Sequence, residues 1–464
     1  MSGTKGVRAS WLRVCLLPAA LLATACAHYP VNAPLARYDP GPVTPEQAAK
    51  GSDEILLFLS FSGGGTRAAA FSYGVLEQLR DTEVTIGGQK RRLLDEVDWI
   101  SSVSGGSFTA GYYGLFGDRV FTDFERRFLK KDVEGALAVR VFLNPVNWVR
   151  MLSPAFGRSD LASEYYDEQI FDGGTFGDLA KRSGPRILMN ATDVLSGARV
   201  GFTQDAFDVI CSDLAPFTVA RAAAASSAVP LVLSPVTLRN YAGSCGFQLP
   251  EHMRRFLEDP GPAAQRFRAE DDVRPFLDAE KTPYLHLVDG GVSDNLGLRT
   301  YLTRSLALGG FVEAFKPFGA ERARTVVFIV VNAAREETRK YYGSESSPPI
   351  GAIAASYVVT TMAHRDADTL FLLRESLRPW TEEAQRRRCG AGPVSTEPGA
   401  CGDIRFHVIE VKFDALQDEA ERSYLNGLPT SFVLPDEGVD RLRAAARRIL
   451  VESGEFQRLV RGLR

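Results

Sequence analysis

A glycine-rich turn between an apolar run and a helical pattern is the first feature with chemical potential. It reads Ser62-Gly63-Gly64-Gly65-Thr66-Arg67 and follows the apolar run 55–61. Three glycines at the start of a helix leave backbone N–H groups uncovered at the positive end of the helix dipole, which suits an oxyanion or a phosphate. The turn lacks the Gly-Lys-Ser/Thr ending of a nucleotide-binding P-loop. A tight turn that serves only helix packing is the alternative interpretation.

A second glycine-rich turn carries a candidate nucleophile. Ser102-Val103-Ser104-Gly105-Gly106 ends the apolar run 97–103. It matches the nucleophile-elbow pattern G-x-S-x-G, with Ser102 in place of the first glycine. The elbow needs small neighbours because its serine sits on a strained strand-to-helix turn, and serine is small. The alternative is a helix N-cap serine.

A serine nucleophile needs a base, and the sequence offers histidines and an aspartate. The histidines are His28, His252, His286, His364 and His407. The order Ser, Asp/Glu, His of elbow hydrolases makes His364 and His407 formal candidates, but neither lies in a glycine-rich turn. Asp289 directly follows the strand-like run 284–288 and precedes Gly290-Gly291. We therefore expect Asp289 to accept the proton of Ser104.

Buried strands must position these turns. The apolar runs 55–61, 97–103, 186–190 and 325–331 alternate with helical stretches such as 67–80. This alternation predicts an α/β fold with a central, mostly parallel sheet flanked by helices in a three-layer sandwich. Residues 334–350 and 381–404 are predicted loops. Most aromatic residues between 116 and 172 are expected to pack an accessory layer, with a lid or acyl-chain site as the alternative.

The N-terminus predicts export. Lys5, Arg8 and Arg13 precede a short apolar stretch that ends at Ala23-Thr24-Ala25, as in a signal peptide over residues 1–25. Cys26 follows as in the lipobox of bacterial lipoproteins, although Leu22 lies one position early; plain secretion is the alternative to lipidation of Cys26. A non-acidic Ala27 implies the outer membrane, so we expect a membrane-anchored lipoprotein of the cell envelope that faces the periplasm or the surface.

Domain boundaries follow from composition. Residues 26–50 are rich in proline and alanine and are expected to form a tether. Residues 51–335 form the expected catalytic core, and residues 336–464 are expected to pack on it as a C-terminal extension.

Four cysteines remain besides Cys15 of the signal peptide and Cys26 of the lipobox. An even number in an oxidising compartment favours two disulfides, and nearest-neighbour pairing gives Cys211–Cys245 and Cys389–Cys401. Zinc binding is the alternative, but no C-x-x-C spacing supports it. We expect no metal.

Composition limits the remaining classes. The 464 residues contain 45% hydrophobic residues, which predicts a folded protein, and 54 basic against 57 acidic residues give a net charge of −3. The basic surface of a nucleic-acid-binding protein is therefore not expected. No apolar run reaches the ~18–20 residues that span a bilayer.

Five motifs in order resemble the patatin-like phospholipase family, with features of the cytosolic group IV phospholipase A2 branch. They are Ser62–Arg67, Ser102–Ser107, Asn190–Asp193, Ala224–Pro230 and Asp289–Gly291, within residues 53–335. The resemblance implies Ser104 as nucleophile and Asp289 as base of a dyad. It further implies Gly63, Gly64 and Gly65 as the oxyanion hole, Arg67 as a contact for the substrate phosphate, and no cofactor. Asp193 and Asn295 are interpreted as loop-stabilising residues.

The sequence thus predicts a serine esterase of the phospholipase A type that acts on membrane lipid. One alternative is an esterase or thioesterase on other acyl groups. The other is a catalytically idle envelope lipoprotein that binds lipid. The oligomeric state is not readable from the sequence.

Overall fold

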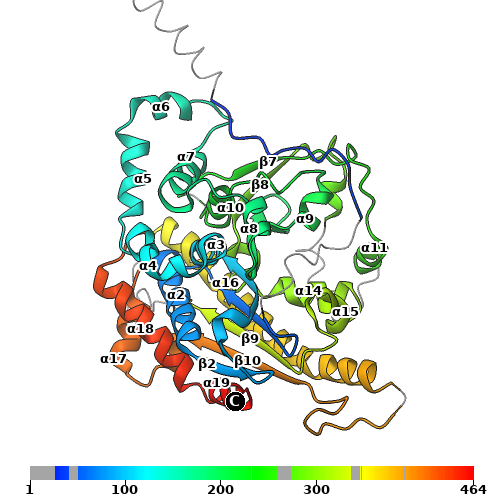
Figure 1. Cartoon of the computed structure of the whole chain (residues 1–464). Helices are drawn as coiled ribbons and strands as arrows, with labels where there is room; N and C mark the ends of the chain where they lie inside the picture. Colours follow the sequence, from blue (N-terminus) through cyan, green and yellow to red (C-terminus); the bar gives the residue numbers. More distant parts are fainter. Residues whose placement is uncertain are drawn as a thin grey trace, which may run out of the picture.

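The computed structural model describes residues 27–40, 51–230, 232–258, 273–335, 345, 347–390 and 392–463 (Figure 1). The expected signal peptide, Cys26 and residues 41–50 of the expected tether lie outside the described residues.

A central sheet organises the molecule, with strand order β10-β9-β1-β4-β5-β8-β7 and β6 paired to β5. The strands are β1 (Ile55–Phe61), β4 (Val97–Val103), β5 (Arg186–Asp193), β6 (Arg199–Gly201), β7 (Val236–Arg239), β8 (Tyr284–Asp289), β9 (Thr325–Asn332) and β10 (Arg405–Lys412). From β10 to β5 all neighbouring strands are parallel, whereas β6, β7 and β8 pair in antiparallel fashion. A separate hairpin joins β2 (Glu83–Ile86) to β3 (Gln89–Arg92).

The strands are continuously apolar because both faces of the sheet are covered. In β1, Leu57 and Leu59 pack into one core cluster, while Leu56 and Phe58 pack into the other. Successive side chains of a strand point to opposite faces, so a strand buried on both sides needs apolar residues at every position.

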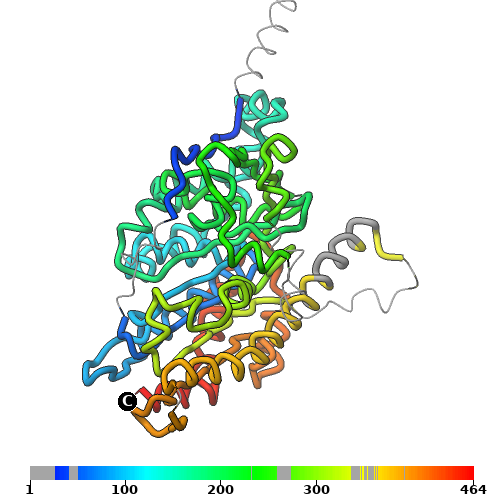
Figure 2. Tube along the Cα trace, turned by 90° about the vertical axis from the view of Figure 1, so that its right-hand side faces the viewer, coloured from blue at the N-terminus to red at the C-terminus, as the bar shows by residue number. Residues whose placement is uncertain are grey.

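Helices form the two outer layers. On one face lie α2 (Gly65–Asp81), α3 (Gly105–Phe116), α10 (Val219–Ser226) and α18 (Asp436–Glu452), and on the other lie α14 (Arg299–Ala307), α15 (Phe311–Phe315) and α16 (Ile350–Cys389). Figure 2 shows α16 running along one side of the molecule. The expected α/β fold, a mostly parallel sheet between layers of helices, is confirmed.

The remaining helices are short. They are α4 (Val120–Phe124), α5 (Val133–Phe142), α6 (Pro145–Met151), α7 (Arg158–Tyr166), α8 (Phe176–Lys181), α9 (Gln204–Val209), α11 (Glu251–Glu258), α13 (Gly291–Asp294), α17 (Glu419–Gly427) and α19 (Gly454–Gly462). Within the described ranges, no helix is both long and apolar enough to cross a membrane.

Residues 392–463 pack against the rest of the domain at two places. Strand β10 lies beside β9 at the edge of the sheet, and α18 packs closely on α2, where a Cβ on Gly74 would lie 2.5 Å from the Arg443 carbonyl oxygen.

The prediction of a loop over residues 381–404 was wrong for residues 381–389, because α16 continues to Cys389. Trp380 and Ala384 are four residues apart and pack into the core. Most residues around them are charged or polar, so the sequence pattern did not indicate a helix there.

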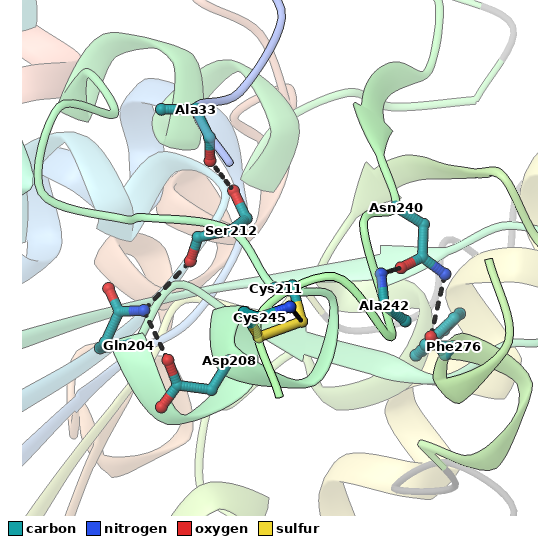
Figure 3. Close-up of a disulfide and its surroundings, with 9 residues drawn as sticks. All are labelled: Ala33, Gln204, Asp208, Cys211, Ser212, Asn240, Ala242, Cys245 and Phe276. Carbon is teal, nitrogen blue, oxygen red and sulfur yellow. Dashed lines mark hydrogen bonds between the residues drawn. A yellow bond between two sulfur atoms is a disulfide. The ribbon is translucent and has the colours of Figure 1, made fainter. Parts of the chain in front are cut away.

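Residues 27–40 lie along the domain and are held by hydrogen bonds. The backbone N–H of Leu35 donates to Cys211 O at 2.7 Å, and that of Tyr38 donates to Cys245 O at 2.9 Å. Figure 3 shows the Cys211–Cys245 disulfide with Ser212 bonded to Ala33. This part of the expected tether is therefore fastened to the domain rather than a free spacer.

The second disulfide joins Cys389 at the end of α16 to Cys401. Both bonds link the pairs expected from the sequence.

Candidate active site

Ser104 occupies a strained turn between β4 and α3. Its backbone has φ 50° and ψ −122°, a conformation that non-glycine residues rarely adopt and that costs about 1–3 kcal/mol. A Cβ on the next residue, Gly105, would lie 2.0 Å from the Gly65 carbonyl oxygen. The turn therefore has the geometry of a nucleophile elbow, and only glycine fits directly after the serine.

Ser102 replaces the first glycine of the elbow pattern without a clash. It lies in β4 and is fully buried. Its hydroxyl donates to Leu188 O at 3.1 Å and accepts from the Ser107 hydroxyl at 3.2 Å. Because this position is regular strand, it tolerates a side chain whose polar group is satisfied.

Ser104 and Asp289 meet in a buried site. The Ser104 hydroxyl interacts with the Asp289 carboxyl and lowers its pKa, and the two residues are 4% and 7% exposed. The Gly291 N–H also donates to Asp289 Oδ1 at 2.8 Å. Burial raises the pKa of the Asp289 carboxyl to about 6, although the Gly291 N–H and the Ser104 hydroxyl oppose the rise. A carboxylate with this pKa is ionised at neutral pH and is a stronger base than an exposed aspartate.

Ser226 connects the two halves of this pair, a role that the sequence analysis did not foresee. Its hydroxyl accepts from the Ser104 N–H at 2.9 Å and donates to Asn190 O at 2.7 Å. Its carbonyl accepts from the Gly290 N–H at 3.1 Å, and Ala228 O accepts from the Asp289 N–H at 3.0 Å. The end of α10 thus holds the turn of Ser104 and the turn of Asp289. In the sequence, the pair Ser226-Ser227 after a run of alanines was the feature that could have indicated this role.

The three glycines of the first turn have different roles. Gly63 N–H donates to Asn295 O at 3.1 Å, so it is occupied. Within the part of the chain that the structure describes, no hydrogen bond engages the N–H groups of Gly64 and Gly65. Gly65 lies against Gly105 beside the nucleophile and has φ +61°. Among the three glycines, Gly64 and Gly65 therefore keep backbone donors that the described residues do not engage.

Arg67 is buried beneath this turn. Its Nε donates to Ala333 O at 2.9 Å, its Nη1 to Leu428 O at 2.8 Å and its Nη2 to the Thr430 hydroxyl at 3.1 Å. None of these partners is anionic. Burial and the nearby Arg335 lower the pKa of Arg67 to about 9. Arg67 thus joins α2 to the end of β9 and to the C-terminal segment, and its charge lies below the glycine turn.

The five histidines all lie in described segments, and none bonds to Ser104 or Asp289. His407 is in β10 and pairs with Glu455 at 2.6 Å, and His286 faces the Thr237 hydroxyl at 3.2 Å. His364 is exposed on α16. The contacts of His407 and His286 therefore lie with residues other than Ser104 and Asp289.

The neighbouring carboxylates have structural partners. Asp193 accepts from the Ser196 N–H at 2.9 Å and the His286 N–H at 3.0 Å, so it holds the loop after β5 as expected. Asp294 accepts from the Arg299 N–H at 2.9 Å.

Helix α16 supports the loop that contains Asn295. The Asn295 amide donates to Asp366 at 2.8 Å, and Arg365 donates to Val292 O at 2.9 Å. Burial raises the pKa of Asp366 to about 8. The sequence analysis missed Asp366, because it lies in a helix about 70 residues from its partner with no motif around it.

Among the described residues, no group of three or more potential ligands could hold a metal ion.

The fold is an α/β fold with a mostly parallel sheet between helices, and it brings Ser104 and Asp289 together in a buried site. The sequence matches the family described as patatin-like phospholipase over residues 59–302, and the chain belongs to this family. That range contains both glycine turns, Ser104 and Asp289.

Two similar solved structures are those of human GIVD cytosolic phospholipase A2, alone and in complex with methyl gamma-linolenyl fluorophosphonate. Each is 14% identical and covers 92% of this chain; the TM-scores are 0.44 and 0.37. The matches cover 63% and 60% of those chains, so this chain spans less than two thirds of each. No curated protein sequence matches the chain.

Proposed function

We propose that this protein is a lipid acyl hydrolase of the phospholipase A type, with Ser104 as nucleophile and Asp289 as base. The observation that carries the proposal is the placement of Ser104, on its strained turn, beside the buried Asp289 carboxyl, whose pKa the Ser104 hydroxyl lowers. Family membership supports acyl hydrolysis in general.

The geometry supports a two-step reaction. Ser104 Oγ attacks the ester carbonyl carbon while Asp289 takes the hydroxyl proton. Negative charge develops on the carbonyl oxygen, and the N–H groups of Gly64 and Gly65 receive it; one such donor contributes about 3–4 kcal/mol to the transition state. Asp289 then returns the proton to the leaving alcohol. Water, deprotonated by Asp289, then attacks the acyl carbonyl, and Asp289 returns this proton to Ser104 Oγ as the free acid leaves.

In this proposal, the positive charge of Arg67 attracts the phosphate of an anionic substrate. Its buried charge lies beside the glycine turn, where a Cβ on Gly64 would be 3.2 Å from Arg67 Nη2. Because its hydrogen-bond partners are neutral, this charge is available to favour a nearby phosphate electrostatically.

We further propose that the protein is an envelope lipoprotein anchored through Cys26. The sequence of residues 1–26 supports this proposal, which also places the enzyme beside its membrane substrate.

Labelling with a fluorophosphonate probe tests the activated serine. The unaltered chain should be labelled, and Ser104→Ala should not be. Asp289→Asn should lose at least about 1,000-fold in phospholipid turnover, as expected when a general base is removed. Ser72→Ala is the matched control: Ser72 is buried, and its hydroxyl has no partner among the described residues, so its loss should leave turnover unchanged.

Folded Ser104→Ala that is still labelled would contradict the mechanism. Labelling without hydrolysis across a panel of phospholipids, combined with hydrolysis of short-chain esters or thioesters, would identify the protein as a general esterase instead.

A further inference from the structure

An exposed apolar ridge projects from the end of α5 and from α6. Its members are Val139, Phe142, Leu143, Val146, Trp148 and Leu152, which are between 52% and 73% exposed. Most other aromatic residues of this region are buried, including Phe124, Phe128 and Tyr166. Exposed apolar side chains gathered within one short segment, residues 139–152, are unusual and mark an interaction surface.

The residue types of the ridge suit the interface of a bilayer. Leucine and phenylalanine enter the acyl region, and tryptophan favours the boundary between acyl chains and headgroups. Residues 139–152 contain two arginines and no acidic residue. Arg140 pairs with Glu168, and Arg150 pairs with Glu164. Because these charges are compensated, binding should depend on apolar insertion more than on anionic lipid.

Residues 27–40, the N-terminal segment, start beside this ridge. Ala27 is buried in a small cluster with Phe156 and Leu161, against which Val141 and Met151 pack. The Tyr29 N–H donates to Ala155 O at 2.8 Å. Figures 1 and 2 show the start of this segment beside α6, at the end of the molecule opposite the C-terminus. Cys26 directly precedes Ala27 in sequence, so an acyl anchor there would enter the membrane beside the ridge.

Helix α5 also links the ridge to the glycine turn. At its first turn, Glu134 accepts a hydrogen bond from the Ser431 hydroxyl, and Ser431 O accepts from the Thr66 N–H at 2.9 Å. The ten residues of α5 span about 15 Å, half the ~30 Å thickness of a bilayer's hydrocarbon core. A bilayer that contacts the ridge would therefore lie close to the candidate site.

We propose that the ridge of α5 and α6 is a membrane-docking surface that inserts into the interface of a lipid bilayer. The proposal rests on the proposed function, since a lipid hydrolase must meet its substrate at such a surface.

Trp148 provides a direct probe of insertion. Trp99 and Trp380 are buried, so in the full chain with Trp11→Phe the exposed tryptophan is Trp148. Vesicles of phosphatidylcholine with brominated acyl chains should quench its fluorescence and shift its emission to the blue. The quenching should persist in high salt, and it should disappear when Trp148→Phe is added.

Variants test whether docking serves turnover. Leu143→Ser/Leu152→Ser, in the full chain with Cys26→Ser so that no acyl anchor masks the effect, should reduce vesicle binding and vesicle phospholipid hydrolysis about tenfold or more. Its hydrolysis of a soluble short-chain ester should not change. Val451→Ser is the matched control, since Val451 is an exposed apolar residue on α18 and should have no effect on either substrate.

The outcomes separate docking from catalysis. Absence of Trp148 quenching, with equal vesicle hydrolysis by the double variant, would overturn docking and leave the hydrolase proposal intact. Quenching by vesicles without hydrolysis of any ester would support docking and overturn the hydrolase proposal. If the double variant instead loses self-association and vesicles have no effect on Trp148, the ridge is a protein interface and the proposal is wrong.

Discussion

At the scale of single residues, the buried position of Asp289 determines its chemistry. A carboxylate in water is a weak base, and here burial raises the pKa of Asp289 to about 6 while the Gly291 N–H and the Ser104 hydroxyl favour its ionised form. In the proposed dyad, this pKa supplies basicity without an imidazole.

This pKa predicts the pH dependence of turnover. The base must be ionised, so kcat/KM should be low below pH 6, rise as pH increases through about 6 and level off above it. Initial rates on a neutral short-chain ester between pH 4 and 8 measure the profile. His364→Gln and His407→Gln should retain it; loss of hydrolysis in either folded variant would replace the dyad with a triad.

Arg67 is predicted to matter for both folding and substrate choice. Arg67→Ala should lower the free energy of unfolding by about 2–3 kcal/mol, because Ala333 O and Leu428 O lose buried donors. If its charge also favours the substrate phosphate, phospholipid turnover should fall more than turnover of a neutral ester. Both rates and the thermal midpoint are to be measured; equal losses on the two substrates would limit Arg67 to its structural role.

At the scale of elements, the parts of the site differ in how far the sequence predicts them. Ser104 and Asp289 each end an apolar strand and precede glycines, so local pattern is enough to identify them. Ser226 and Asp366 act through contacts with residues 122 and 71 positions away, Ser104 and Asn295. Such partners depend on how α10 and α16 pack, which no local pattern encodes.

The buried carboxyl of α16 predicts a change in stability with pH. Because the pKa of Asp366 is about 8 in the folded protein and 3.8 is its ordinary value, the folded state holds a proton that the unfolded state releases. The contribution of this group to stability is therefore full below pH 4 and is lost as pH rises toward 8.

Asp366→Asn should remove this dependence. The variant keeps an oxygen that accepts from Asn295, and relative to the unaltered chain it should gain about 2 kcal/mol or more between pH 4 and 8, since one pKa unit corresponds to about 1.4 kcal/mol. Denaturant unfolding at both pH values measures the difference. A constant difference across this range would show that Asp366 is not protonated in the folded protein.

At the scale of the whole molecule, distant parts of the chain converge on one domain. The C-terminal segment contributes β10 to the sheet and contacts the glycine turn through Ser431. Residues 27–40 lie at the end of the domain opposite the C-terminus (Figure 1) and donate hydrogen bonds to the carbonyls of Cys211 and Cys245, which form a disulfide. The position of Ala27 relative to the ridge therefore depends on the contacts of residues 27–40.

The Cys211–Cys245 disulfide is predicted to hold the N-terminal segment in place. It closes a loop of sequence separation 34, so Cys211→Ser/Cys245→Ser should cost about 3–4 kcal/mol by the chain-entropy relation. The amides of Leu35 and Tyr38, which donate to the carbonyls of the two cysteines, should exchange faster with solvent. Cys389→Ser/Cys401→Ser is the matched control: its loop of separation 12 should give a smaller loss of about 3 kcal/mol, and exchange at Leu35 and Tyr38 should be unchanged. If those amides stay protected without the first disulfide, the hydrogen bonds of Asn32 with Arg239 and Ser212 hold the segment alone.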